Sequence, residues 1–156
     1  MDRMVIKWLS AIVLCFLLVT SGYSDEAQVK PVAADPAIQE FIRLVNAKRR
    51  SMGCPELIWD DRVAAIASTH SRDMDSRNFF SHTNPEGRDP FDRLQKSDVA
   101  FSAAAENIAF GPKTGHEVYE TWLDSPGHRR NMLDCSFTRH GVGRVAEKWT
   151  HLLFRP

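Results

Sequence analysis

Three polar residues, of types that are common in metal-binding and catalytic sites, lie within or at the ends of apolar segments. Glu106 stands in a run of small and apolar residues (104–109), His82 follows Phe79-Phe80-Ser81, and His128 follows Ser125-Pro126-Gly127. A buried carboxylate without a partner is costly or has a raised pKa, so a chain that buries one usually supplies a partner. Residues beside turns are common in functional sites. We therefore expect His82, Glu106 and His128 to meet in one cleft.

Two imidazoles and one carboxylate are suitable ligands for zinc or another divalent cation, with one position left for water. In a second interpretation, Glu106 lies outside the ligand shell and accepts the remaining ring N–H of a histidine, which fixes its tautomer. In a third, the trio holds no metal and is a hydrogen-bonded cluster that orients loops. The sequence has no H-E-x-x-H pattern of a metalloprotease.

A hydrolase would also need a nucleophile. Ser81 and Ser125 adjoin or precede the histidines, and a metal-bound water is the other candidate. No G-x-S-x-G pattern supports either serine, and Ser125 before Pro126-Gly127 is typical of a cap or turn. A binding module is thus the favoured function, and a metal-dependent hydrolase or peptidase and a lipid or sterol carrier are the alternatives.

The N-terminus has the pattern of an export signal. A basic start, a short apolar run and a small-residue exit predict a signal peptide over residues 1–24, with an uncleaved membrane anchor as the alternative. Residues 25–36 are polar with two prolines and predict a flexible linker. One domain then fills residues 37–156. A secreted, periplasmic or extracellular location follows.

Charge and cysteine content limit the partners. The chain has 20 basic and 20 acidic side chains without a dense basic block, which argues against nucleic acid. We expect a monomer whose partner is an extracellular protein, peptide or lipid. Of three cysteines, Cys15 lies in the signal, so Cys54 and Cys135 form an even pair in an exported chain. A disulfide is expected, and two free buried thiols are the alternative.

Periodicity predicts the elements that carry these residues. Helices begin at Asp35-Pro36, Asp60, Asp89-Pro90 and Thr114 or Gly115, and a helical turn covers 128–133. Strands are predicted for 78–82, 104–110 and a terminal hairpin at 141–146 and 149–154. His70 falls on an apolar helix face, which favours a hydrogen-bonded core residue. The aromatic residues are expected in the core, with an apolar groove as the alternative: Phe79, Phe80, Phe91, Phe101, Tyr119 and Trp122. An α+β fold with an antiparallel sheet results.

Five motifs in one order resemble the CAP superfamily, the cysteine-rich secretory, antigen 5 and pathogenesis-related proteins, in its compact bacterial branch. They are His70-Ser71-Arg72-Asp73-Met74, Phe79-Phe80-Ser81-His82, Ala105-Glu106-Asn107-Ile108-Ala109, Trp122-Leu123-Asp124-Ser125-Pro126-Gly127-His128-Arg129 and Gly141-Val142-Gly143. The resemblance implies an α–β–α sandwich over roughly residues 38–154. It also implies a cleft of two histidines and two glutamates, able in some relatives to hold zinc. His82, Glu106 and His128 match three of these residues, and Ser125 stands where the second glutamate is expected.

Overall fold

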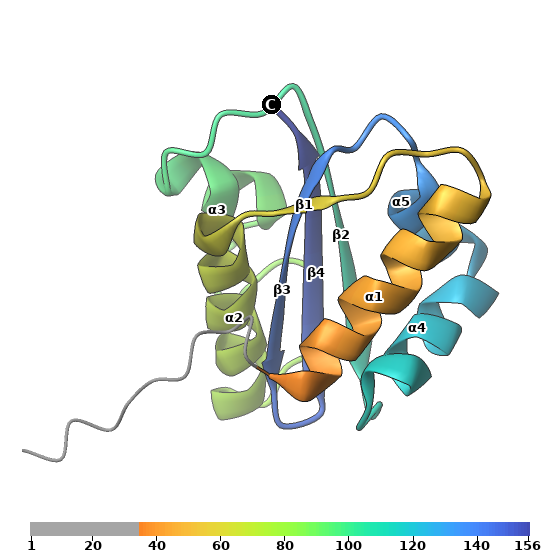
Figure 1. Cartoon of the computed structure of the whole chain (residues 1–156). Helices are drawn as coiled ribbons and strands as arrows, with labels where there is room; N and C mark the ends of the chain where they lie inside the picture. Colours follow the sequence, from red (N-terminus) through yellow and green to blue (C-terminus); the bar gives the residue numbers. More distant parts are fainter. Residues whose placement is uncertain (1–34) are drawn as a thin grey trace, which may run out of the picture.

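The computed structural model describes residues 35–156 (Figure 1). The predicted signal peptide and nearly all of the predicted linker lie outside the described residues. The elements are α1 (Pro36–Ser51), β1 (Ile58–Trp59), α2 (Asp61–Ser76), α3 (Pro90–Lys96), β2 (Ala103–Phe110), α4 (Gly115–Asp124), α5 (Pro126–Leu133), β3 (Arg139–Val145) and β4 (Lys148–Arg155). Within residues 35–156, no helix has the length and apolar character needed to cross a membrane.

Aspartates begin three of the helices, as the sequence predicts. The side chain of Asp35 accepts from the Ala37 amide, and that of Asp60 accepts from the amides of Arg62 and Val63. Asp89 forms a reciprocal capping box with α3. These carboxylates satisfy amides that have no partner inside the helix. The start of each helix is therefore fixed locally by its own residues.

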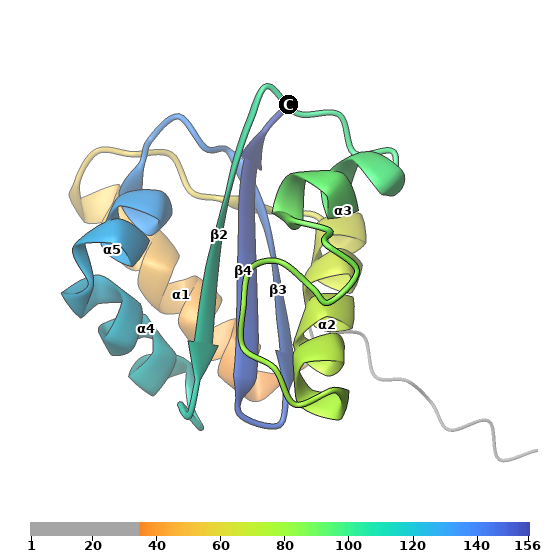
Figure 2. The same cartoon turned by 180° about the vertical axis from the view of Figure 1, so that it is seen from behind.

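A four-stranded sheet separates two helical layers, which confirms the α–β–α sandwich. The strand order is β1-β3-β4-β2, and β3 pairs with β4 as the predicted hairpin. Helices α1, α4 and α5 lie on one side of the sheet, and α2 and α3 lie on the other (Figures 1 and 2). The three long strands are antiparallel. The sheet as a whole is mixed, because the short β1 pairs with β3 in parallel.

Residues 78–82 do not form the predicted strand. Asn78 has a positive φ of 51° and turns the chain away from α2. The carbonyls beyond it are bound by side chains instead of a neighbouring strand: Lys148 Nζ donates to Phe79 O, and His70 Nε2 donates to Ser81 O. Since these long-range donors satisfy the backbone, the alternating sequence pattern here does not lead to a ladder.

The aromatic residues divide between core and surface. Tyr119 and Trp122 are buried as predicted, in the cluster between the sheet and the α1/α4/α5 layer. Phe80 and Phe91 are instead about half exposed, at 50% and 43%. The core prediction is wrong for these two: Phe80 lies in the loop after α2 and Phe91 at the start of α3, and neither belongs to the two buried clusters of residues 35–156.

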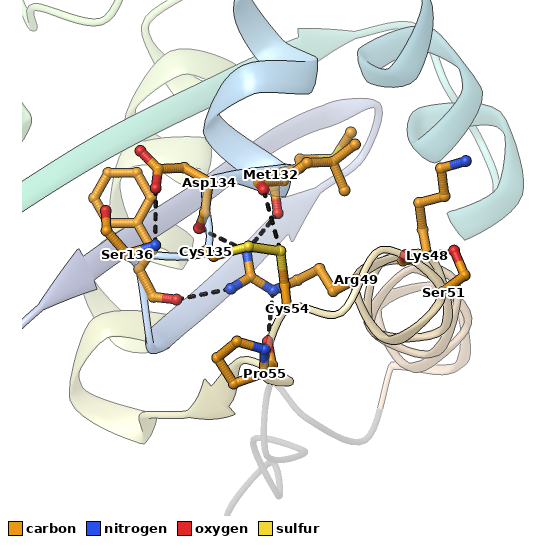
Figure 3. Close-up of a disulfide and its surroundings, with 11 residues drawn as sticks. Lys48, Arg49, Ser51, Cys54, Pro55, Met132, Asp134, Cys135 and Ser136 are labelled. Atoms are coloured by element: carbon orange, nitrogen blue, oxygen red, sulfur yellow. Dashed lines mark hydrogen bonds between the residues drawn. A yellow bond between two sulfur atoms is a disulfide. The ribbon is translucent and has the colours of Figure 1, made fainter.

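The predicted disulfide is present and lies beside a buried arginine (Figure 3). Cys54 and Cys135 join the segment after α1 to the segment after α5, with Cα atoms 5.0 Å apart. Arg49 of α1 is fully buried and donates to four carbonyls in the segment after α1, the end of α5 and the segment that follows α5: Pro55, Met132, Asp134 and Phe137. A covalent bridge and one guanidinium thus hold α1 and the chain after α5 together.

Helix α2 approaches β3 so closely that two strand positions tolerate only glycine. A Cβ at Gly143 would overlap the backbone of Ala67 and Ser68, and one at Gly141 would overlap that of Val63 and Ala64. Neither glycine has a positive φ. The requirement is therefore steric, and it sets the distance between helix and sheet.

We expect Gly143→Ala to lower the free energy of unfolding by about 1–3 kcal/mol or more, because the added methyl group must displace helix backbone. Urea unfolding followed by tryptophan fluorescence measures this change. Gly127→Ala is the matched control, since a Cβ there meets nothing within 4 Å. Equal stability of the two variants would contradict this account of the α2–β3 contact.

Candidate functional site

The loop after α2 positions His82 through its carbonyl groups. Ser81 O accepts from the buried His70, and His82 O accepts from Arg93 Nη1 at 2.9 Å. Arg93 lies on α3, and it also binds Arg88 O. His70 is therefore the hydrogen-bonded core residue that its helical position predicts, with a residue exposure of 1%. A loop without strand partners is held in one conformation by side chains from two helices.

Glu106 is buried and has two partners. Its side chain is 1% exposed, Oε1 accepts from His82 Nδ1 at 2.8 Å, and Oε2 accepts from Arg93 Nη2 at 2.7 Å. Arg93 is itself 9% exposed, whereas the His82 side chain is 49% exposed. A buried carboxylate thus gains a cation and an imidazole, as its burial requires.

Arg93 is the site residue that the sequence interpretation missed. The arginine lies 13 positions before Glu106, on a different element, and no local motif marks it. The burial of Glu106 did predict a partner, but a sequence cannot show which distant cation meets it. Arg93 donates to the Glu106 carboxylate and to the His82 carbonyl, so it fixes Glu106 and His82 relative to each other.

The His82–Glu106 contact defines the tautomer of the histidine. Because a carboxylate only accepts, Nδ1 carries the proton and Nε2 of the neutral ring has a free lone pair. This is the arrangement in which a carboxylate orients a histidine for metal binding or proton transfer. Both Glu106 oxygens are engaged, one by His82 and the other by Arg93.

His128 lies in the first turn of α5 and is joined to β2 through asparagines. Its carbonyl accepts from Asn107 Nδ2 at 3.1 Å, and Asn131 Nδ2 donates to Asn107 Oδ1 at 2.9 Å. The His128 Nδ1 atom is buried without a hydrogen-bond partner. Burial and, to a smaller extent, the charge of His82 lower the pKa of His128.

The structure does not form a three-ligand cluster from these side chains. Among residues 35–156, no three His, Cys, Asp or Glu side chains are placed to hold a metal ion together. Glu106 contacts His82 directly, whereas His128 is tied to Asn107, the next residue of β2, whose side chain points to the other face of the sheet.

Ser125 separates α4 from α5 and ends one helix while it begins the other. As N-cap of α5 its side chain makes no capping hydrogen bond, and its carbonyl accepts from the Arg129 amide at 2.8 Å. This placement agrees with the expected cap or turn role. No acidic side chain replaces the second glutamate that the resemblance implies at this position.

Comparison with known proteins gives the family. Residues 42–149 match the CAP family, described as the cysteine-rich secretory protein family. The chain belongs to the CAP family. Two Bacillus subtilis relatives, the uncharacterized protein YkwD and the uncharacterized membrane protein YlbC, are each 38% identical, over 81% and 67% of this chain. The matches cover 49% and 30% of those two proteins, so this CAP chain spans half or less of their length.

Solved structures share the CAP fold. An extracellular Bacillus anthracis protein that contains an SCP domain is 39% identical, with a TM-score of 0.73 over 76% of this chain and 40% of that one. An outer surface protein of Borrelia burgdorferi has a TM-score of 0.73 at 20% identity, over 78% of this chain and 93% of that one. The likeness to the Borrelia protein supports the fold alone.

Proposed function

We propose that this CAP protein acts outside the cell as a binding module whose recognition centre is His82. The observation that carries the proposal is the hydrogen bond from His82 Nδ1 to the buried Glu106, which leaves Nε2 available on a half-exposed ring. Export agrees with the pattern of residues 1–24 and with the extracellular and outer-surface relatives.

Exposed aromatic rings on the segments that carry His82 and Glu106 would give the partner an apolar contact. Phe80 and Phe110 are 50% and 62% exposed, and their ring centroids lie 6.3 Å apart. Phe110 ends the strand that carries Glu106. An exposed aromatic pair on these two segments suits a peptide or protein segment with an aromatic or aliphatic side chain. A lipid ligand remains an outcome to be tested by solvent extraction of the purified protein.

We propose further that the two imidazoles are ligands of a divalent ion. His82 Nε2 and a nitrogen of His128 would supply the protein donors, Glu106 would act from the outer position, and water or the bound partner would complete the shell. The unpartnered Nδ1 of His128 supports this assignment, because it marks a buried acceptor or donor that lacks a protein partner. Such an ion would supply Lewis acidity at this position.

Zinc titration by calorimetry tests the site. His82→Ala and His128→Ala are each expected to weaken zinc binding at least about tenfold, and Glu106→Gln about tenfold, as outer carboxylates do elsewhere. His116→Ala is the matched control, since the His116 side chain is 62% exposed on α4 and its ring lies 3.9 Å from Glu120, away from the proposed ligands. Unchanged affinity in both cleft variants would overturn the metal assignment.

The hydrolase alternative rests on the same contact, because a carboxylate-oriented imidazole is also a suitable general base. Mixed peptide and ester substrates, with and without zinc, separate the two functions. Turnover that disappears in both His82→Ala and His128→Ala would replace the binding proposal. Partner capture from extracellular material without turnover would support it.

A further inference from the structure

A second groove, here called the α2/α3 groove, runs between α2, the loop of residues 83–89 and α3 (Figure 2). Its volume is about 760 Å³. The α2 residues that line it recur every three or four positions, from Arg62 through Thr69 to Ser76, so they form one stripe along the helix. At 1.5 Å per residue, this wall is about 21 Å long. The groove is therefore elongated, and it suits an extended chain of about six residues better than a compact molecule.

Basic side chains outnumber acidic ones in the lining of this groove. Six cations line it: Arg62, Arg72, Arg77, Arg88, Arg93 and Lys96. Two carboxylates do so, those of Asp73 and Glu86. The folded chain thus gathers basic residues along one groove, although it is neutral as a whole and no dense basic block marks them in the sequence.

Four of the six cations already have acidic partners. The ion pairs join Arg62 to Asp60, Arg93 to Glu106, Arg77 to Asp73 and Glu86, and Arg88 to Glu86. Four carboxylates therefore stand against six cations, and two positive charges remain.

Arg72 and Lys96 are the two cations of the groove that form no ion pair within the described part of the chain. Both residues are exposed. Arg72 lies on α2 and Lys96 is the last residue of α3, so the two charges belong to different walls of the groove. A ligand that runs along the groove can pair with each of them at a different point of its own chain, and the two cations need not be neighbours.

The other polar groups of the groove favour a peptide over a uniform polyanion. A chain that carries a negative charge on every unit would be repelled where it passes Asp73 and Glu86. A peptide carries carboxylates only at some positions, and its backbone offers an N–H and a C=O group at nearly every residue. The exposed hydroxyl groups of Thr69, Ser76 and Ser97 line the groove and are suitable partners for such a backbone.

We propose that the α2/α3 groove binds an extended acidic segment of a partner protein. Aspartate or glutamate side chains of that segment pair with Arg72 and Lys96, and its backbone bonds to the hydroxyl groups along the groove. Exposed ion pairs contribute little individually and are screened by salt, so the affinity is modest and falls as the salt concentration rises. The groove does not include His82, Glu106 or His128 in its lining, and it binds its partner independently of the His82 site.

A phage library of random heptapeptides tests the groove. The library is first depleted on the double variant Arg72→Glu/Lys96→Glu and then selected on the wild-type protein, so that the recovered peptides depend on these two cations. They are expected to be enriched in aspartate and glutamate. Fluorescence anisotropy should give a Kd about tenfold or more higher for the double variant, because two attractive contacts become repulsive. Added salt should raise the wild-type Kd.

The matched control is Arg43→Glu/Lys48→Glu, which reverses two exposed charges of α1 in the other helical layer and changes the net charge by the same amount. All four positions are exposed, so both double variants should keep the wild-type urea midpoint. The control and His82→Ala should each bind the recovered peptides within about twofold of the wild type.

Three results would overturn the site. Equal loss of binding in the α1 control would show a non-specific effect of net charge. Failure to recover peptides, or recovery of peptides without acidic enrichment, would show that the groove does not select an acidic segment. Loss of binding in His82→Ala would place the peptides at the His82 site instead.

Discussion

Replacing Arg49 with methionine should lower the free energy of unfolding by about 3–5 kcal/mol. The guanidinium is fully buried and donates to four carbonyls at 2.8–2.9 Å. Methionine keeps much of the volume but leaves these buried acceptors without donors, and each unsatisfied group is costly. Urea unfolding at neutral pH with the disulfide intact measures the loss.

Two further variants sharpen this prediction. Arg49→Lys keeps the charge but offers a single ammonium in place of a planar fork, so it should recover only part of the stability. Arg43→Met on the exposed side of α1 should change stability by no more than about 0.5 kcal/mol. A loss below about 1 kcal/mol for Arg49→Met would show that the carbonyls find other partners.

Acidification from pH 7 to pH 4 should destabilise the protein through a buried histidine pair. His140 Nδ1 and His151 Nε2 lie 3.1 Å apart and both residues are 0% exposed, on the hairpin strands β3 and β4. Burial, with a contribution from the Arg49 charge, lowers the pKa of His140 to about 3 and that of His151 well below its usual value.

The sign follows from the depressed pKa values. The neutral rings stabilise the fold fully above the unfolded pKa of about 6.5, and this contribution is lost as the pH falls toward the folded pKa. For His140 alone the loss between pH 6.5 and pH 4 is about 3 kcal/mol. Stability should therefore fall steeply below pH 6.

Unfolding free energies of the wild type and of His140→Leu/His151→Leu, measured at several pH values, test this prediction. The double variant removes both polar partners, so neither ring is left alone, and its stability should depend less on pH. Asp60 and Asp134, whose pKa values are lowered by hydrogen bonds and nearby arginines, lose their contributions below pH 4 in both proteins. Parallel pH profiles of the two proteins would contradict the role of the pair.

The site shows how far a sequence-based prediction of function extends. Glu106 is buried and has a histidine partner, His82. The sequence predicts this contact because a buried carboxylate needs a hydrogen-bond donor. The cation Arg93, the asparagine link of His128 and the placement of Phe80 and Phe110 were not predictable. Each depends on which residues of separate elements become neighbours.

The amino-acid sequence by itself determined the helix starts, the terminal hairpin, the disulfide partners and the α+β class, since capping, periodicity and cysteine count act locally or by composition. Only the tertiary structure decided that residues 78–82 are a loop and that Arg49 is buried. These features need a donor, a carbonyl or a charge supplied by a distant segment. A folded chain brings such groups together, and no short stretch of sequence contains both members of the contact.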